Sequence, residues 1–435
     1  MIVQSNPGVP YVILGKNRFT GNVPTHLCEL RSMNILDLSN NNFSGVLPNC
    51  LGSLIHLRVM NLKNNTITGD IPNSLGSLSY LRSLHLSNNK LEGNLPVALQ
   101  NLTSLVIFDL GNNLLTGKIP YWIGKNLLKL KILNLQSNKF MGKIPPELCE
   151  INALQHLNLA NNNITGTIPH CFCNLAGMIM TSDNCVNYGT GMFNSSYSGT
   201  SSVSTDYIYY NRSGYEEYIV TYIKGIQLEY TKSIRFLISL DLSSNKIIGE
   251  IPDVLMKLVA LKNLNLSRNL LSGQIPTTIG NLRQMESLDL SANKLCGQVP
   301  SSLASLNFLS YLNLSFNNLS GRVPIGNQLQ TLGDPSTIYE GNIELCGPLL
   351  SWSCKENNLS YAHANKDEGK YGSQGCLWFY AGIVSGFVTG FMGLVGSLLF
   401  IRIWRVTYFE MIENVYTFLT ISIIQTFALL KRKIF

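Results

Sequence analysis

The 435-residue sequence lacks the short motifs that mark most enzymes and metal proteins. It has no G-x-S-x-G turn, no Walker motif and no pair of carboxylates in a catalytic pattern. No cysteine or histidine pairs have zinc spacing. The sequence therefore predicts a protein without catalytic residues, metal or cofactor.

The excess of positive over negative charge is also small. The net charge is +7, and the tail after Ile401 carries five basic and two acidic side chains, so +3 of it lies there. The remaining +4 is spread over a long chain, and no basic patch is interleaved with aromatics. The sequence thus gives no sign of nucleic-acid binding.

A signal peptide is missing, because no charged segment followed by an apolar one comes after Met1. No cysteine-containing cap precedes the first repeat either, although solenoids normally need a cap at each end. We therefore expect an N-terminally truncated gene product or a natural fragment. A less favoured alternative is a short chain inserted into the membrane through its C-terminal segment.

One sequence motif is repeated eleven times, and its clearest copy runs from Leu264 to Pro276. Each copy has a Gly four residues after its Asn and a Pro seven residues after it. The step is 24 residues, except for one of 25 and one of 83. The Asn residues of the copies are Asn17, Asn41, Asn65, Asn89, Asn113, Asn138, Asn162, Asn245, Asn269, Asn293 and Asn317. The L-x-x-L-x-L-x-x-N period predicts an α/β repeat solenoid of the leucine-rich-repeat type.

The residue types explain why eleven copies make a fold. In L-x-L the two leucines point to one side, so each copy supplies a short strand. The Asn side chain has two donors and an acceptor, enough to satisfy turn backbone that stacking removes from water. Gly permits the tight turn that follows, and Pro fixes φ as the chain leaves it.

The residues between the strand leucines should face the concave side. One column of them is mostly Asp and Asn and is interpreted as structural. The neighbouring column varies in size and polarity, which favours recognition; the alternative is a merely solvent-facing column. With His85 from the first column, the candidate ligand-binding residues are Tyr11, Ile35, Val59, Ser83, Ile107, Ile132, His156, Ser239, Asn263, Ser287 and Tyr311.

An insert breaks the period at residues 172–236 and holds nine of the nineteen tyrosines. Tyrosine offers a large contact area with a polar tip, and inserts in solenoids often lie on the binding face. We therefore add Tyr207, Tyr209 and Tyr210 to the candidate site. The alternative is a partly disordered insert.

Seven segments follow from these patterns. They are 1–171 with seven repeats, the insert 172–236, 237–324 with four repeats, a cap at 325–356, a spacer at 357–376, a membrane span at 377–401 and a tail at 402–435.

The span has 25 uncharged residues, which as a helix is ~37 Å against ~30 Å of hydrocarbon. Arg402 and Arg405 follow at once, so we expect a single-pass plasma-membrane protein with its repeats outside. Gly382, Gly386 and Gly390 would line one helix face for packing against another helix. The apolar run 415–430 is interpreted as a helix on the inner leaflet; the alternative is a second span.

The cysteines point to an oxidising compartment. Cys28 and Cys149 lie 11 residues after a repeat Asn, and Cys50 and Cys171 lie 9 after the next one, which suggests inter-coil disulfides. Further expected pairs are Cys346–Cys354 and, more weakly, Cys173–Cys185, with Cys296 and Cys376 left over. Ten N-x-S/T sequons precede the span, at Asn42, Asn64, Asn101, Asn163, Asn194, Asn211, Asn265, Asn313, Asn318 and Asn358.

These residues carry a resemblance. The repeated motif L-x-L-S-x-N-x-L-S-G-x-I-P is similar to the plant extracellular type of leucine-rich repeat. Other features resemble plant receptor-like proteins. They are the insert four repeats before the end, Lys224-Gly225 with Glu229-Tyr230, the G-N…L-C-G cap, the glycine stripe formed by Gly382, Gly386 and Gly390, and a tail with W-R-V-T-Y-F at 404–409. That family includes kinase-lacking resistance receptors of the tomato leaf-mould (Cf) type.

The resemblance implies a plasma-membrane receptor for an extracellular protein, peptide or glycan ligand, most often from a pathogen. It would signal in defence through a leucine-rich-repeat receptor kinase packed on the glycine stripe, with a co-receptor kinase recruited later. The alternatives are a developmental receptor-like protein for an endogenous peptide and a non-functional truncated paralogue. A soluble inhibitor of microbial cell-wall enzymes is a further alternative, which the predicted span argues against.

Overall fold

A computed structural model describes residues 9–179, 215, 217–350 and 354. The chain divides into two compact units, residues 1–356 and 357–435, and the second lies wholly outside the described residues. The predicted spacer, span, glycine stripe and tail therefore lie outside them, as do Cys185, Cys376 and the three candidate tyrosines at 207, 209 and 210. Within the part that the structure does describe, none of the helices combines the length and apolar character that crossing a membrane requires.

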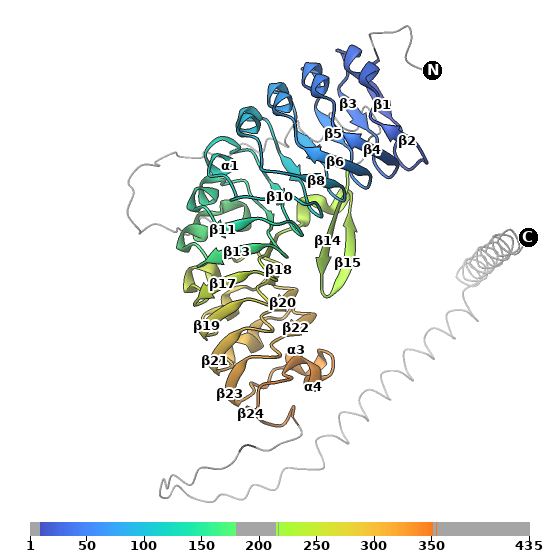
Figure 1. The fold of residues 1–435 in the computed structure, drawn as a ribbon. Coiled ribbons are helices and arrows are strands. Elements are labelled where there is room, and N and C mark those ends of the chain that lie inside the picture. Colours follow the sequence, from blue (N-terminus) through green and yellow to red (C-terminus); the bar gives the residue numbers. More distant parts are fainter. Residues whose placement is uncertain (1–8, 180–214, 216, 351–353, 355–435) are drawn as a thin grey trace, which may run out of the picture. The chain divides into compact units, whose positions relative to one another are not determined.

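The coils stack through a parallel sheet to which each contributes one strand (Figure 1). Neighbouring strands pair at equal repeat positions, as Leu84 does with Met60 and Phe108. The strands, in order, are β1 (Tyr11–Ile13), β3 (Ile35–Asp37), β5 (Val59–Asn61), β7 (Ser83–His85), β9 (Ile107–Asp109), β10 (Ile132–Asn134), β12 (His156–Asn158), β16 (Ser239–Asp241), β18 (Asn263–Asn265), β20 (Ser287–Asp289) and β22 (Tyr311–Asn313). Because β12 pairs directly with β16, the insert leaves the stack uninterrupted. The face of this sheet turned away from the leucine core is called the inner face below.

Shorter sheets flank the turns that follow the repeat Asn. One contains β2 (Thr20–Asn22), β4 (Asn42–Val46), β6 (Thr66–Asp70) and β8 (Lys90–Glu92). The other contains β11 (Met141–Lys143), β13 (Asn163–Gly166), β17 (Lys246–Gly249), β19 (Leu270–Gln274), β21 (Lys294–Gln298), β23 (Asn318–Arg322) and β24 (Glu344–Cys346).

The outer side differs from the expected α/β pattern, because most of its helical turns are 3₁₀. They are η1 (Thr25–Glu29), η2 (Asn49–Ser53), η3 (Asn73–Ser77), η4 (Val97–Asn101), η5 (Pro146–Glu150), η6 (His170–Asn174), η7 (Ala176–Met178), η8 (Lys232–Phe236), η9 (Asp253–Lys257), η10 (Ile279–Asn281) and η11 (Ser301–Ser305). Their bonds join residues three apart, as in Leu27 N–H to Pro24 O.

The α-helix α1 (Trp122–Asn126) lies in the coil between Asn113 and Asn138, which is the coil with 25 residues. There Leu127 N–H donates to Ile123 O, four residues back. One extra residue is what the wider α turn needs, whereas a 24-residue coil closes with the tighter 3₁₀ turn.

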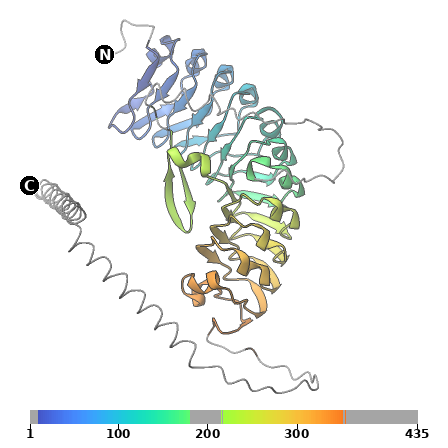
Figure 2. The same ribbon diagram turned by 180° about the vertical axis from the view of Figure 1, so that it is seen from behind.

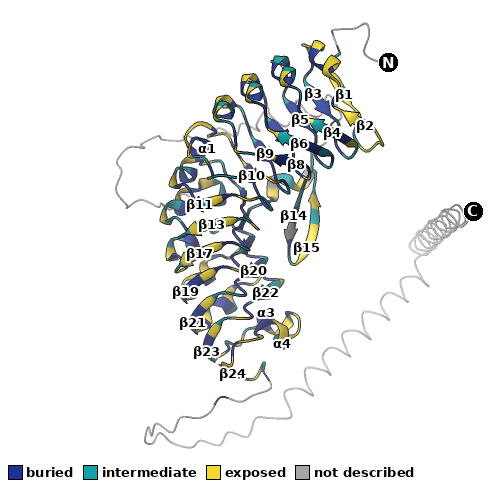
Figure 3. Ribbon diagram, in the orientation of Figure 1, coloured by how far each residue is buried: buried dark blue, intermediate teal, exposed yellow. Residues whose placement is uncertain are grey.

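Leucine rows form one core along the whole stack (Figure 3). In the fourth coil, Leu84 and Leu86 of the L-x-L strand are fully buried. A coil thus buries its apolar side chains against its neighbours rather than within itself, as expected for a solenoid.

The repeat Asn residues form a ladder that satisfies the turn backbone. The Oδ1 of Asn89 accepts from Ile67 N–H at 3.0 Å, in the preceding coil. Its Nδ2 donates to Leu62 O at 3.0 Å in that coil and to Leu86 O at 3.1 Å in its own. From Asn41 onward, each repeat Asn links two coils by bonding backbone groups of its own coil and of the preceding one.

The glycine after each Asn is required by its backbone conformation. Gly45 has φ +71°, which favours glycine, and a Cβ there would overlap the Oδ1 of Asn22 in the preceding coil. The positive φ recurs at all eleven glycines and explains why glycine is invariant among the copies.

The C-terminal cap closes the stack with α3 (Asn327–Thr331), α4 (Pro335–Ile338) and β24. Asn342 takes the ladder role there, since its Oδ1 accepts from Leu319 N–H and its Nδ2 donates to Leu314 O, both at 3.0 Å. It lies 25 residues after Asn317 but lacks the Gly and Pro that follow other copies, so sequence analysis missed it.

Among the cysteines that the structure describes, three disulfides are formed. Cys28–Cys50 and Cys149–Cys171 each join the helical turns of adjacent coils, and Cys346–Cys354 pins the cap. Cys296 of β21 is half-buried, with its Sγ 3.5 Å from Gly273 O.

Candidate functional site

Part of the insert forms a β-hairpin that lies over the inner face (Figures 1 and 2). Its strands are β14 (Ile219–Ile223) and β15 (Ile226–Tyr230). Lys224 and Gly225 join them with φ +59° and +72°, the two positive values of a type I′ turn. Both views show the tip directed toward the C-terminal coils.

An apolar contact fixes the middle of the hairpin. Ile219 is 0% exposed and, with Ile223, packs against Ile107 of β9 and Ile132 of β10. Alternate residues of β14 face the sheet, since Thr221 between them is also buried. The hairpin therefore contributes its own apolar face to a small core on top of the inner face.

Tyr215 anchors the segment that leads into β14. Its ring packs on Ile35 and Val59. Its hydroxyl donates to Asp37 Oδ2 at 2.8 Å and accepts from Asn61 Nδ2 at 3.1 Å. Burial raises the pKa of Tyr215, as does the charge of Asp37, so the hydroxyl keeps its proton and acts as a donor.

Tyr218 makes a second anchor through a cation. Its ring centroid lies 3.6 Å from Nζ of Lys63, whose side chain is only 1% exposed. Its hydroxyl accepts from Asn40 Nδ2 at 2.7 Å. Burial lowers the pKa of Lys63, although the charges of Asp109, Glu229 and Asp37 oppose that shift.

Glu217, which lies between Tyr215 and Tyr218 in the sequence, belongs to a group of charged side chains around His85. Nε2 of His85 is 3.7 Å from Oε1 of Glu217, which the hairpin segment supplies, and Nδ1 is 3.5 Å from Oδ2 of Asp109. These are ion-pair rather than hydrogen-bond distances. Burial alone would lower the pKa of His85, but the two carboxylates raise it to about 9.

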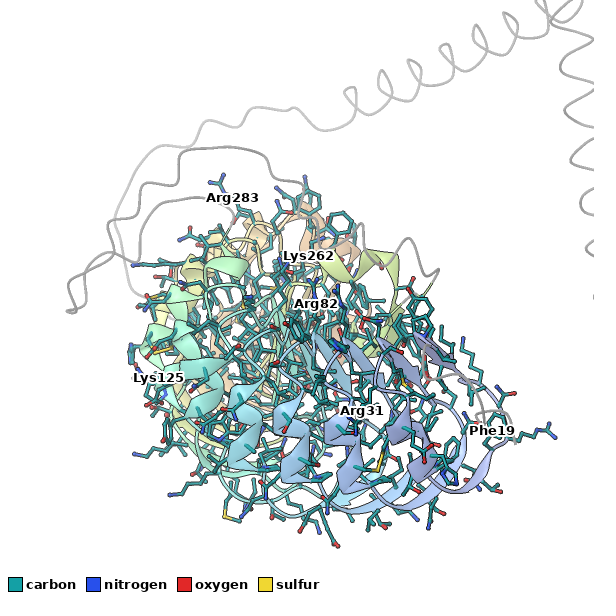
Figure 4. The ribbon with its side chains drawn as sticks, turned by 90° about the horizontal axis from the view of Figure 1, so that it is seen from above. Phe19, Arg31, Arg82, Lys125, Lys262 and Arg283 are labelled. Atoms are coloured by element: carbon teal, nitrogen blue, oxygen red, sulfur yellow. A yellow bond between two sulfur atoms is a disulfide. The ribbon has the colours of Figure 1, made fainter. Side chains whose placement is uncertain are left out.

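The hairpin tip contacts the last coils. Lys224 N–H donates to Ser287 Oγ at 3.3 Å, and Lys224 Nζ lies 3.0 Å from Oε2 of Glu286. Lys262 Nζ approaches the other oxygen of Glu286 at 3.5 Å. In the view along the coils, Lys262 lies near the hairpin, whereas Lys125 of α1 lies at the outer edge (Figure 4).

The predicted ligand-binding column differs from the expectation of an exposed surface, because most of it is buried. Tyr11 is 44% exposed and Tyr311 is half-buried. The buried members are Ile35, Val59, Ser83, Ile107, Ile132, His156, Ser239, Asn263 and Ser287, and His85 of the neighbouring column is buried too. The hairpin explains this: its residues touch the column at Ile35, at Ile107 and Ile132, and at Ser287, and the remaining buried members lie between these contacts.

Beside the hairpin tip, an open strip of side chains stays accessible. From β15 it includes Ile226, which is 56% exposed. From the last coils it includes Tyr311, Asn313 and Phe316, the last being 55% exposed. The Tyr311 ring lies close to the tip, since a Cβ on Gly225 would be 3.5 Å from it.

Sequence analysis missed the residues that hold the hairpin. Tyr215 and Tyr218 were among the insert tyrosines but were not singled out. No sequence pattern marked Glu217 or Lys63 as part of a site. The alternation of Ile219, Thr221 and Ile223 before Lys224-Gly225 could have predicted a hairpin with one buried face.

The sequons are not equivalent. Asn42, Asn101, Asn163 and Asn318 are exposed. Asn64, Asn265 and Asn313 are half-buried, and their amides take part in side-chain hydrogen bonds with Asn40, Ser267 and Ser315 respectively. Asn194, Asn211 and Asn358 lie outside the described residues. Among the residues that are described, no group of three His, Cys, Asp or Glu side chains could hold a metal ion.

Comparison with known proteins agrees with this architecture. Leucine-rich-repeat models match residues 31–91 and also 104–126, 129–151, 153–175, 236–258, 260–282, 284–306 and 308–332, together about half of the chain. A curated relative, the receptor-like protein EIX2 of Solanum lycopersicum, is 50% identical over 218 residues. That match covers 48% of this chain and 21% of the relative, so the chain spans about a fifth of its length.

Among solved structures, a TDR receptor is similar with a TM-score of 0.57 and 27% identity, over 73% of this chain and 44% of that one. A plant ice-binding protein is similar with a TM-score of 0.52 and 26% identity, over 72% of this chain and 81% of that one. The plant peptide hormone receptor RGFR1, solved in complex with RGF2, shares the fold at 24% identity and a TM-score of 0.56 over 78% of this chain and 47% of that one. None of these relatives is named as an enzyme. The chain therefore belongs to the leucine-rich-repeat family, and its repeats are similar to those of plant receptor-like proteins and receptor ectodomains.

Proposed function

We propose that the chain is the ligand-binding part of a plant cell-surface receptor-like protein without a kinase, and that it binds an extracellular, pathogen-derived ligand at the open strip. One observation carries the proposal: Tyr215 and the hairpin cover the inner face at β3, β5, β9 and β10, whereas Ile226 at the tip and Tyr311 and Phe316 of the last coils keep accessible side chains. The similarity to a receptor-like protein supports the receptor role.

The chemistry of the open strip suits a peptide segment. It offers aromatic and aliphatic surface from Phe316, Tyr311 and Ile226, which can bury apolar side chains of a ligand. It offers Asn313 as a hydrogen-bonding group at its margin. Binding sites typically combine such apolar area with a few polar groups that set orientation. A defence receptor and a developmental receptor for an endogenous peptide would differ only in the ligand that this strip accepts.

Replacing Tyr311 by alanine tests the site. As probe we would use a phage-displayed library of random linear dodecapeptides, selected against the purified full chain. Peptides that bind through the open strip should bind Tyr311→Ala at least about tenfold more weakly, because a central aromatic anchor carries a large share of binding energy. Binding to Tyr80→Ala should stay unchanged, since that tyrosine is 59% exposed and stacks on His56 outside the strip. Selected peptides that bind Tyr311→Ala as tightly as the wild type would remove the strip as the site.

We further propose that signalling passes to a partner receptor kinase through the glycine stripe at 382–390, with a co-receptor kinase joining after ligand binding. The proposal rests on the sequence pattern of small residues at every fourth position. In plant cells, Gly386→Leu should abolish co-purification with a leucine-rich-repeat receptor kinase. Val384→Leu adds one methylene on another face of the helix and should not. Equal co-purification of both variants would contradict a role for the stripe.

A further inference from the structure

We propose that the hairpin is a pH-sensitive latch, which docks on the inner face while His85 is protonated and loosens when His85 loses its proton. This inference concerns how the insert is held and does not depend on the proposed ligand. It starts from a carboxylate that the hairpin segment places in the buried contact, that of Glu217.

The geometry makes His85 the partner on which Glu217 depends. The Oε1 of Glu217 is buried and has no hydrogen-bond partner. Nε2 of His85 lies 3.7 Å from it. Asp109, on the other side of the ring, does not share this dependence. Its carboxylate accepts from Ser87 Oγ at 2.6 Å and from Asn134 Nδ2 at 2.9 Å.

Loss of the His85 proton therefore acts on the hairpin more than on the coils. A buried carboxylate that loses its cationic partner becomes strongly unfavourable. Asp109 keeps its two hydrogen bonds from the solenoid, whereas the buried Oε1 of Glu217 gains a water partner when its segment leaves the inner face. Opening of the hairpin is thus the relaxation that the structure offers.

Other titratable groups surround this contact. From the solenoid they are Asp37 of β3, Lys63 after β5, Asp109 of β9 and His156 of β12; from the insert they are Tyr215, Glu217, Tyr218 and Glu229. The two tyrosines have raised pKa values because of burial and stay neutral over the physiological range. The pH dependence considered below is that of the two histidines, whose pKa values are shifted to about 9 for His85 and about 4 for His156.

The two histidines act in opposite directions. The pKa of His85 is raised to about 9, so its stabilisation of the docked state is complete below about pH 6.5 and is lost as pH rises toward 9. Burial lowers the pKa of His156 to about 4, so its contribution is complete above about pH 6.5 and is lost as pH falls toward 4. Docking should be strongest at about pH 6.

Hydrogen–deuterium exchange on the full chain tests the latch. After correction for intrinsic exchange rates, protection of the hairpin amides at 219–230 should fall on the order of tenfold between pH 6 and pH 8.5, because the loss at His85 outweighs the gain at His156. Protection of the amides in the last coils at 263–313 serves as the reference and should change little. A hairpin profile that is flat over this range would overturn the proposal.

Variants assign the effect to its residues. His85→Gln should weaken docking at pH 6 and flatten the profile, while His156→Gln should steepen it. Glu217→Gln, which changes no coil residue, should also reduce the pH dependence. His85→Gln combined with Glu217→Gln should dock better than His85→Gln alone, since two amides can pair without a charge. A wild-type profile in either single variant at 85 or 217, or no recovery in the double variant, would contradict the latch.

Discussion

Replacing Asn113 by alanine should lower the free energy of unfolding by about 3 kcal/mol. The Asn113 Oδ1 accepts from Leu91 N–H at 3.0 Å, and its Nδ2 donates to Leu86 O at 3.0 Å in the preceding coil and to Leu110 O at 3.0 Å in its own. The side chain is buried between coils, so water cannot replace these bonds. Chemical denaturation of the full chain measures the loss.

The bonds of the neighbouring Asn residues explain where this cost arises. Leu86 O also accepts from Asn89, and Leu110 O also accepts from Asn138, so both carbonyls keep a partner in the variant. Leu91 N–H has Asn113 as its acceptor and is left buried and unpaired. An orphaned buried donor of this kind costs about 1–3 kcal/mol, to which the other lost bonds add.

The first coil supplies a matched control. Asn17 holds the same repeat position, but it is exposed, and its Nδ2 donates to Leu14 O and Gly15 O of its own coil. Asn17→Ala should therefore cost less than about 1 kcal/mol. Equal losses for the two variants would mean that the bonds between coils are not what makes the ladder stabilising.

The ladder and the stack were predictable from sequence because each contact repeats at one interval. A residue 24 positions away is the neighbour in space, so the period gives the register of β5, β7 and β9 directly. Asn, Gly and Pro occur at fixed offsets for reasons that act inside one coil or between adjacent coils. Local chemistry repeated at a constant step leaves few alternatives.

The candidate site was not predictable in this way. Tyr215 and Asp37 are 178 residues apart in sequence, and no period relates them. The concave column was expected to face solvent because nothing in its residues shows that Ile219 and Ile223 cover Ile107 and Ile132. The 3₁₀ type of the helical turns on the outer side was also not predicted, because it depends on how tightly a 24-residue coil must close.

Replacing Ile219 by alanine should release the hairpin from the inner face. The side chain is 0% exposed and packs between Ile107 and Ile132, so its truncation removes buried apolar area and leaves a cavity that two coil strands cannot fill. The cost of such a change is about 3 kcal/mol, which raises the population of the open hairpin about a hundredfold. Hydrogen–deuterium exchange at 219–230 should accelerate by that factor.

The paired strand provides the control, because Ile226 lies next to the tip, outside the apolar contact, and is 56% exposed. Ile226→Ala makes the same chemical change and should alter hairpin exchange less than about threefold, since surface substitutions cost within ~0.5 kcal/mol. In both variants the denaturation midpoint of the coils should stay unchanged, because β9 and β10 remain paired within the sheet. Similar exchange in the two variants would mean that Tyr215, Tyr218 and the charges of the His85 contact hold the hairpin without its apolar face. The inner face would then be covered by polar anchors rather than by a second core.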